Sequence, residues 1–183
     1  MRIYLRPVTL QDGPTIVKWR NTPSVSAHCL NQQPITLESN EKFFHENIET
    51  GKYQQYIVER VEEEFGLVSY PIATVYLKDI DYNNRRCELC IFTSNDEEWN
   101  SESQSIAIKM LLDKAFSEVG MHKVYSYAFY SFLNEANLLK RAGFTIEGIL
   151  KKEAVGADGR YEDIVRFGIT DEEWKGQYSQ PLS

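Results

Sequence analysis

Three cysteines and three histidines are the side chains of this 183-residue chain that most often act as nucleophiles or metal ligands. Cys87 and Cys90 have the spacing of half a zinc or redox motif. They lie, however, in RRCELCIF, which reads as a strand, where residues three apart point to opposite faces. The sequence has no second cysteine pair, and its histidines lack metal-ligand spacing. We therefore expect packing thiols, no metal site and no hydrolase.

A second stretch with chemical potential is EEWNSESQSIAIKMLLDKAF, from Glu97 to Phe116, which has the pattern of a helix with an apolar stripe. The unpaired N–H groups and positive dipole end of a helix N-terminus can bind a phosphate. Phosphate-binding turns usually contain glycine so that the backbone can approach, and this turn has none. Ser101 and Gln104 also have capping-box spacing, so the same residues are explained by an ordinary helix start.

Sequence periodicity predicts the elements that position these residues. Asp12 with Gly13-Pro14 starts a helix that ends near residue 21, and Thr36 is the N-cap of a second helix that ends at Gly51. Further helices are predicted up to residue 120 and over residues 136–142. Pro71 cannot donate a ladder hydrogen bond, so it should lie at a bulge or an edge. The expected strands are 3–8, 54–61, 67–77, 85–93, 123–130, 144–155 and 160–170.

This order of elements indicates an α+β fold, with a mixed, mostly antiparallel sheet and helices on both faces. The length and the 42% hydrophobic content predict one domain over residues 1–183. Neither a signal peptide nor a membrane-spanning run is visible, so we expect a soluble, cytoplasmic protein.

The net charge of −7 argues against binding to nucleic acid or to an anionic membrane. It favours a cationic partner, although an acidic surface is equally explained by solubility. The sequence leaves the oligomeric state open, and a homodimer is one arrangement that it allows.

The element order and six motifs resemble the GNAT superfamily of acetyl-CoA-dependent N-acetyltransferases. The motifs are LRPVTLQD, VKWRNTPSV, NNRRCELCIF, MLLDKAF, KRAGFTIEGILKK and DGRYEDIVRFGITDEEW. They cover nearly the whole chain, and the branch they resemble most contains ribosomal-protein N-terminal, spermidine and amino-sugar acetyltransferases. The resemblance implies the GNAT fold, acetyl-CoA as acyl donor, and direct attack on the thioester by a primary amine. The amine would belong to a small amine, an amino sugar or a protein N-terminus.

The resemblance also implies where the acyl donor binds. In GNAT enzymes the fourth strand splays from its neighbour and its backbone holds the pantetheine arm, a role that falls here on Ile91, Phe92 and Thr93. The pyrophosphate would lie on the turn formed by Asn100, Ser101, Glu102, Ser103, Gln104 and Ser105.

Two further family positions lie around the last short helix. Counting without a gap places Phe132 where relatives often carry a pantetheine-binding Asn, and Asn134 or Asn137 replaces it if the loop is shifted. The position of the general-acid tyrosine of some GNAT enzymes is Leu139.

The chain departs from the family pattern at the phosphate turn. The motif Arg/Gln-x-x-Gly-x-Gly/Ala falls on residues 99–104, so that Glu102 and Gln104 occupy the two small positions. Like charges ~4 Å apart repel by about 1 kcal/mol even in water, so Glu102 opposes a phosphate. Two hypotheses follow. One is an enzyme with a weakened loop, where Lys109, Lys140 or Arg141 supplies positive charge. The other is a catalytically degenerate GNAT-fold binding or regulatory module with weak or no CoA binding.

For catalysis, the resemblance implies that Glu88 is the general base, acting directly or through a water, with a backbone N–H near Phe92 stabilising the oxyanion. An exposed Glu88 paired with a basic residue across the sheet is an equally good interpretation. For the acceptor amine, the resemblance points to the first two helices and the last hairpin. The candidates are Trp19, Arg20, Phe44, Tyr56 and Tyr161. Core packing explains Trp19 and most of these aromatic residues as well.

Overall fold

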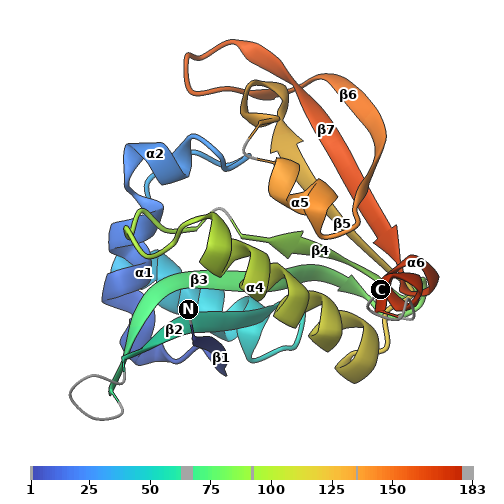
Figure 1. The fold of residues 1–183 in the computed structure, drawn as a ribbon. Coiled ribbons are helices and arrows are strands. Elements are labelled where there is room, and N and C mark those ends of the chain that lie inside the picture. Colours follow the sequence, from blue (N-terminus) through green and yellow to red (C-terminus); the bar gives the residue numbers. More distant parts are fainter. Residues whose placement is uncertain (1, 63–67, 92, 135, 179–183) are drawn as a thin grey trace.

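The computed structural model describes residues 2–62, 68–91, 93–134 and 136–178 (Figure 1). Its strands form one sheet in the order β1-β2-β3-β4-β5-β7-β6. They are β1 (Ile3–Pro7), β2 (Gln54–Glu62), β3 (Val68–Asp81), β4 (Arg86–Cys90), β5 (Lys123–Phe129), β6 (Thr145–Val155) and β7 (Tyr161–Thr170). The α-helices are α1 (Gly13–Arg20), α2 (Pro23–Ser26), α3 (Leu37–Phe43), α4 (Ser101–Asp113), α5 (Asn137–Arg141) and α6 (Asp171–Tyr178). Short turns of other helix types are η1 (Leu10–Asp12), η2 (Phe44–Ile48), η3 (Lys114–Glu118) and η4 (Tyr130–Phe132).

Helices cover both faces of the sheet, as predicted for the α+β class. On one face α4 contributes Ile108, Leu111 and Leu112, all fully buried, to the main core. On the other face α1 contributes Ile16, which packs with Val8 and Ile57 in a second, smaller cluster. Figure 1 shows α4 in front of the sheet and α1 at its other side. The mixed sheet between these layers confirms the expected fold class.

All strand pairs are antiparallel except β4 with β5, which run parallel. Their pairing covers Arg86 to Glu88 on β4 and Lys123 to Tyr125 on β5. β5 then continues to Phe129, and the two strands diverge toward that end (Figure 1). Two parallel strands that separate leave backbone groups without ladder partners, which creates a natural place for a ligand.

The structure corrects three boundaries. β4 ends at Cys90 and not at residue 93, because its pairing with β3 stops at Cys90 and its pairing with β5 stops already at Glu88. Pro23 does end α1, but it then occupies the first turn of α2, where a missing N–H costs nothing. Helix α6 was not predicted, although the Thr170-x-x-Glu173 capping box marks its start: Thr170 N donates to Glu173 Oε2 at 2.8 Å, and Glu173 N donates to Thr170 Oγ1 at 3.3 Å.

The prediction for Pro71 is confirmed. The β2–β3 register pairs Val58 with Ala73 and then Glu59 with Pro71, so Ile72 is skipped and forms a bulge beside the proline. A helix that could cross a bilayer is absent from the described residues.

Candidate functional site

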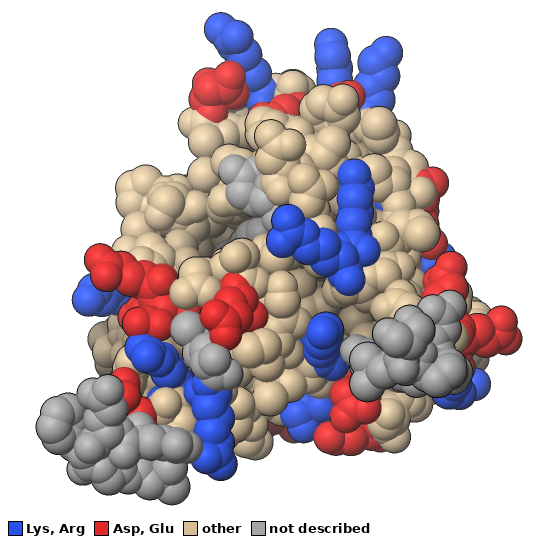
Figure 2. All heavy atoms as spheres, in the orientation of Figure 1, with Lys and Arg blue, Asp and Glu red and all other residues tan. Residues whose placement is uncertain are grey.

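Three neighbouring cavities run from α4 to α1, and we name each by the elements beside it. The α4–α5 cavity has a volume of about 530 Å³, the β4–β5 cavity about 240 Å³ and the α1–α3 cavity about 260 Å³. His28 lines both the first and the second. The second and third share Arg20, Cys29, Asn31, Tyr76 and Thr93. The surface is visibly hollowed between the segment before α4 and α5 (Figure 2).

The β4–β5 cavity begins where the ladder between these strands ends. Glu88 and Tyr125 are the last paired residues, and one residue further the Ser126 hydroxyl donates to the Leu89 carbonyl at 2.8 Å. Ser126 is buried, so its hydroxyl satisfies a carbonyl that the diverging backbone no longer reaches. The splayed strand pair expected from the resemblance is therefore present.

Glu88 lines the β4–β5 cavity and is only 6% exposed. Its Oε1 lies 3.3 Å from Lys78 Nζ on the neighbouring strand and accepts a hydrogen bond from Cys90 Sγ at 3.4 Å. Burial raises the pKa of Glu88, and the opposing effect of Lys78 is smaller. The cross-strand partner that we considered is thus present, but the carboxylate is buried and not exposed. A buried carboxylate with a raised pKa suits a general base.

Lys78 remains a cation beside this carboxylate. Burial lowers its pKa, but the adjacent Glu88 carboxylate raises it, and the net shift is upward. Burial also raises the pKa of Cys90 and of Tyr76 well above their usual values. Both are therefore neutral at physiological pH and present a thiol and a hydroxyl to the cavity. Cys87 packs in the core on the other face, so the two cysteines point apart, as predicted.

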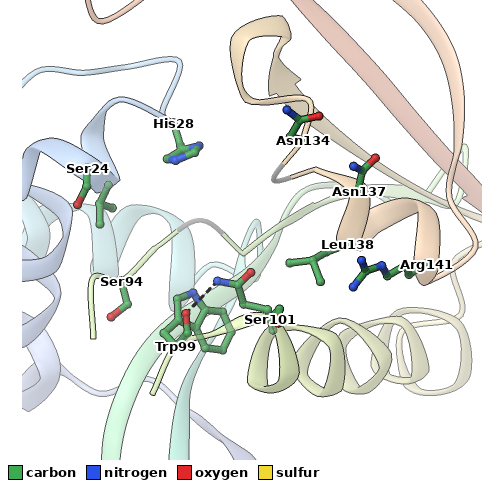
Figure 3. Close-up of a pocket in the computed structure, with 11 residues that line it drawn as sticks. Ser24, His28, Ser94, Trp99, Ser101, Asn134, Asn137, Leu138 and Arg141 are labelled. Atoms are coloured by element: carbon green, nitrogen blue, oxygen red, sulfur yellow. Dashed lines mark hydrogen bonds between the residues drawn. The ribbon is translucent and has the colours of Figure 1, made fainter. Parts of the chain in front are cut away.

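The first turn of α4 faces the α4–α5 cavity through Ser101 and Gln104 (Figure 3). The helix N-cap is Asn100, not the Ser101–Gln104 pair that we considered. Its side-chain oxygen accepts hydrogen bonds from the N–H groups of Glu102 at 3.0 Å and Ser103 at 3.4 Å. Two of the N–H groups that could hold a phosphate are therefore already bonded within the protein.

Three other side chains of this turn also bond within the chain. The buried Ser103 hydroxyl donates to the Glu98 carbonyl at 2.6 Å, and the Gln104 amide donates to the Trp99 carbonyl at 3.0 Å. The Ser105 hydroxyl donates to the Ser101 carbonyl at 2.7 Å. Of the six residues predicted to bind the pyrophosphate, Ser101 and Gln104 line the cavity, and Asn100 and Ser103 serve to start the helix.

Opposite this turn, α5 and the segment before it supply amides and one cation. Asn134, Asn137 and Arg141 line the α4–α5 cavity, and Figure 3 shows Arg141 between α5 and α4, with both asparagines farther from α4. Of the three cations suggested by the sequence, Arg141 is the one in the lining of this cavity. Phe132 instead packs on His28 with the two rings tilted by 35° and their centroids 3.9 Å apart, and Leu139 is fully buried. The alignment with a shifted loop, which uses Asn134 or Asn137 in place of Phe132, is therefore the one that places an asparagine at the cavity.

Backbone groups of β4 were expected to hold the pantetheine arm. Ile91 and Thr93 line the β4–β5 cavity, but the Ile91 carbonyl already accepts a hydrogen bond from Trp99 Nε1 at 3.1 Å. The Thr93 hydroxyl donates a second, longer hydrogen bond to the same carbonyl at 3.5 Å, so both of its lone pairs are in use. Phe92 lies outside the described residues. The amides, Arg141 and the open strand edge fit a pantetheine thioester, whereas the capped α4 turn fits a pyrophosphate less well.

Of the expected acceptor residues, Arg20 lies at the cavities and the others do not. Trp19 is buried, with 5% exposure, and Phe44 packs on the cluster of Val8 and Ile16. Tyr161 is 69% exposed on the last hairpin.

Tyr56 lies on the α4 face of the sheet, with Lys114 Nζ 5.0 Å from its ring centroid. Side chains alternate along a strand, so Gln55 faces the α1–α3 cavity instead. Gln55, Tyr76 and Lys78 also line these cavities but were not predicted from the sequence. The two-residue alternation of side chains along their strands could have indicated them.

Comparisons with known proteins show the family of this chain. The acetyltransferase (GNAT) domain family matches residues 2–145. Spermidine N(1)-acetyltransferase of Vibrio cholerae serotype O1 is 22% identical over 168 residues, 92% of each chain. The Escherichia coli K12 enzyme of the same name is 21% identical over 179 residues, 98% of this chain and 91% of that one. A crystal structure of spermidine N-acetyltransferase from Vibrio cholerae in complex with CoA and spermine has a TM-score of 0.83, with 22% identity, 94% coverage of this chain and 98% of that chain. The family match over most of the chain shows that this protein belongs to the GNAT acetyltransferase family.

Proposed function

We propose that this chain transfers the acetyl group of acetyl-CoA to the primary amine of a small molecule. The observation that carries the proposal is the buried Glu88 carboxylate, which lines a cavity where the only parallel strand pair of the described sheet opens. The α4–α5 cavity on one side offers amides and Arg141 to the donor. The α1–α3 cavity on the other side offers room for an acceptor.

The chemistry of the donor is that of a thioester, whose carbonyl carbon is open to attack by a neutral amine. Glu88 accepts the proton that the amine must lose, because its raised pKa brings it closer to that of a base useful at neutral pH. Lys78 holds the carboxylate in place through the 3.3 Å contact. Asn134 and Asn137 are positioned to hydrogen-bond the amides of the pantetheine arm.

A small-molecule acceptor is favoured because the α1–α3 and β4–β5 cavities are only about 260 and 240 Å³. The solved relative holds CoA together with spermine, so this fold accommodates a small amine beside CoA. A catalytically degenerate module is the competing function, and the capped turn at Asn100 is the observation that favours it.

Calorimetry with acetyl-CoA and a thiol-release assay across a panel of amines test the proposal together. We expect binding of acetyl-CoA and release of CoA thiol that depends on the amine. Absence of heat at millimolar acetyl-CoA would overturn the enzyme and leave the binding module. Binding without turnover of any primary amine would likewise contradict catalysis.

A further inference from the structure

The guanidinium of Arg20 points into the cavities with one nitrogen unused. Ile16 and Arg20 are one helical turn apart on α1 and both line the α1–α3 cavity, whereas Lys18 on another face is exposed. Arg20 Nη2 donates a hydrogen bond to the Asn31 backbone carbonyl. Arg20 Nη1 is buried, and within the described part of the chain it has no hydrogen-bond partner. A buried charged donor without an acceptor is unfavourable, so this nitrogen is suited to an anionic ligand group.

The loop that contacts Arg20 is held in place by α1 itself. Asn21, the C-cap residue of α1, donates from Nδ2 to the Ile35 carbonyl and accepts from the Ile35 N–H, both at 2.8 Å. Two such bonds fix the segment that carries Asn31 over the cavities. The position of the Arg20 guanidinium is therefore built into the fold, and it is not the position of a free surface side chain.

The charge balance of the cavities also favours an anion. Arg20 is the one charged residue among those described in the lining of the α1–α3 cavity, which otherwise presents neutral and apolar side chains. The β4–β5 cavity adds Lys78 and Glu88, which pair with each other. In the described linings, Glu88 is therefore the only carboxylate against two cations. A polyamine has several ammonium groups, and beyond Glu88 these linings offer no carboxylate to receive a second one.

We propose that the acceptor is a small zwitterion, whose primary amine lies at Glu88 and whose carboxylate or phosphate pairs with Arg20. This rests on the proposed acetyltransferase function and names its substrate class. The apolar part of the acceptor packs against Ile16, Ile35 and Phe43. The expected class thus differs from the polyamines named for the similar spermidine acetyltransferases, because the described linings oppose a second positive charge.

Matched amine pairs test the proposal, since each pair differs in one anionic group. β-Alanine is compared with β-alaninamide, glucosamine 6-phosphate with glucosamine, and spermidine serves as the polycation. We expect the anionic member of at least one pair to have a kcat/KM at least ten-fold above its neutral partner and above spermidine. The pair that responds identifies a carboxylate or a phosphate. Equal values within both pairs, or a preference for spermidine, would overturn the proposal.

Substitution of Arg20 tests whether this residue causes the preference for the anionic amine. Arg20→Met is expected to reduce the anionic-to-neutral ratio to about one, through a fall in kcat/KM for the anionic amine that exceeds any change for the neutral one. Arg20→Lys should keep part of the preference, because it retains the charge without the second donor. Lys18→Met removes the same charge from the exposed side of α1 and should leave the ratio unchanged. A ratio unaffected in both Arg20 variants, with thermal unfolding confirming that they fold, would contradict the assignment.

Direct binding keeps this inference separate from the proposed function. Calorimetry of each amine with the CoA-loaded protein, or with the protein alone if CoA fails to bind, measures the preference without turnover. Tighter binding of the anionic member in wild type but not in Arg20→Met supports the anion site even in an inactive protein. Equal affinities of both members overturn the anion site even in an active enzyme.

Discussion

Glu88 and Lys78 form the only ion pair of described residues in the lining of the β4–β5 cavity, and their contact distance is 3.3 Å. Burial raises the pKa of Glu88, so its carboxylate form is lost, as the pH falls, at a higher pH than for an ordinary glutamate. A base must be deprotonated to act. The acid limb of the pH–rate profile should therefore lie above the usual titration range of glutamate.

The substitution Glu88→Gln keeps the size of the side chain and removes the base. We expect kcat/KM to fall by about 10²–10⁴-fold and the acid limb to disappear, as measured by thiol release from pH 5 to pH 9. Glu118→Gln, at an exposed position paired with Lys114, is the matched control. An unchanged acid limb in Glu88→Gln would show that another group titrates.

Lys78→Met tests the partner of this carboxylate. Loss of the ammonium removes the interaction that lowers the pKa of Glu88, so that pKa should rise further. The acid limb is then expected to move to higher pH while the rate on the plateau is retained in part. An acid limb that moves to lower pH, or that does not move, would show that Lys78 does not lower the pKa of Glu88.

At the scale of elements, helix α4 begins with two of its N–H donors already bonded to the Asn100 side chain. Asn100→Gly removes the side chain that occupies the N–H groups of Glu102 and Ser103. Glycine is itself a tolerated N-cap, so the loss of stability should be a few tenths of a kcal/mol. The freed donors should tighten acetyl-CoA binding on the order of ten-fold, about 1.4 kcal/mol, in calorimetry.

Thr36→Gly is the matched control for this change. Thr36 caps α3 by accepting from Ser39 N at 3.1 Å, so the substitution removes a cap of the same kind away from the α4–α5 cavity. We expect it to leave the affinity for acetyl-CoA unchanged. Equal affinities in Asn100→Gly and wild type would mean that the pyrophosphate does not lie on this turn.

The splay of β4 from β5 depends on Ser126, whose hydroxyl donates to the Leu89 carbonyl at 2.8 Å. Ser126→Ala leaves that buried carbonyl unsatisfied, which should lower the free energy of unfolding by about 1–3 kcal/mol. Denaturant unfolding measures this loss. Ser117→Ala, at an exposed hydroxyl bonded to Asp113 on the helix surface, should stay within about 0.5 kcal/mol of wild type. Equal losses in the two variants would contradict the role of Ser126.

Most strands and the long helix could be predicted because their signals are local: two-residue alternation, a 3.6-residue stripe, and Gly or Pro at the ends. The end of β4 could not, because it depends on where the neighbouring strands stop pairing with it, β5 at Glu88 and β3 at Cys90. Some site residues could likewise be predicted from local sequence signals, and others could not. Glu88 and Arg20 lie at the cavities, whereas Tyr56, a candidate for the acceptor site, packs in the main core, as the alternative interpretation had it. The unpaired Arg20 nitrogen needed the three-dimensional structure.

At the scale of the whole molecule, charge is unevenly placed around the α4–α5 cavity. The chain carries a net charge of −7, and Asp96, Glu97, Glu98 and Glu102 precede or begin α4. Figure 2 shows acidic side chains over this segment and basic side chains over α5. Arg60 lies 2.6 Å from Glu98 and offsets part of the acidic charge. An anionic donor therefore approaches a molecule whose long-range field repels it, and Arg141 attracts it only at short range.

Salt should consequently speed the binding of acetyl-CoA. The Debye length falls from about 30 Å at 10 mM salt to about 8 Å at 150 mM, so long-range repulsion is screened while contacts within the cavity persist. We expect the association rate constant, measured by stopped flow, to rise about two- to five-fold over this range. At a donor site dominated by cations, the association rate constant would instead fall as salt is added.

Two variants that each remove one negative charge distinguish the effect of the acidic turn at α4 from the effect of the net charge of the whole molecule. Glu102→Gln takes one negative charge from the start of α4, and Glu172→Gln takes one from the exposed surface of α6. If the acidic turn governs approach, Glu102→Gln should raise the association rate constant at 10 mM salt more than Glu172→Gln and should weaken its salt dependence. Equal effects would assign the repulsion to the net charge alone. A rate constant that falls with salt in the wild type would show instead that Arg141 and its neighbours dominate the approach.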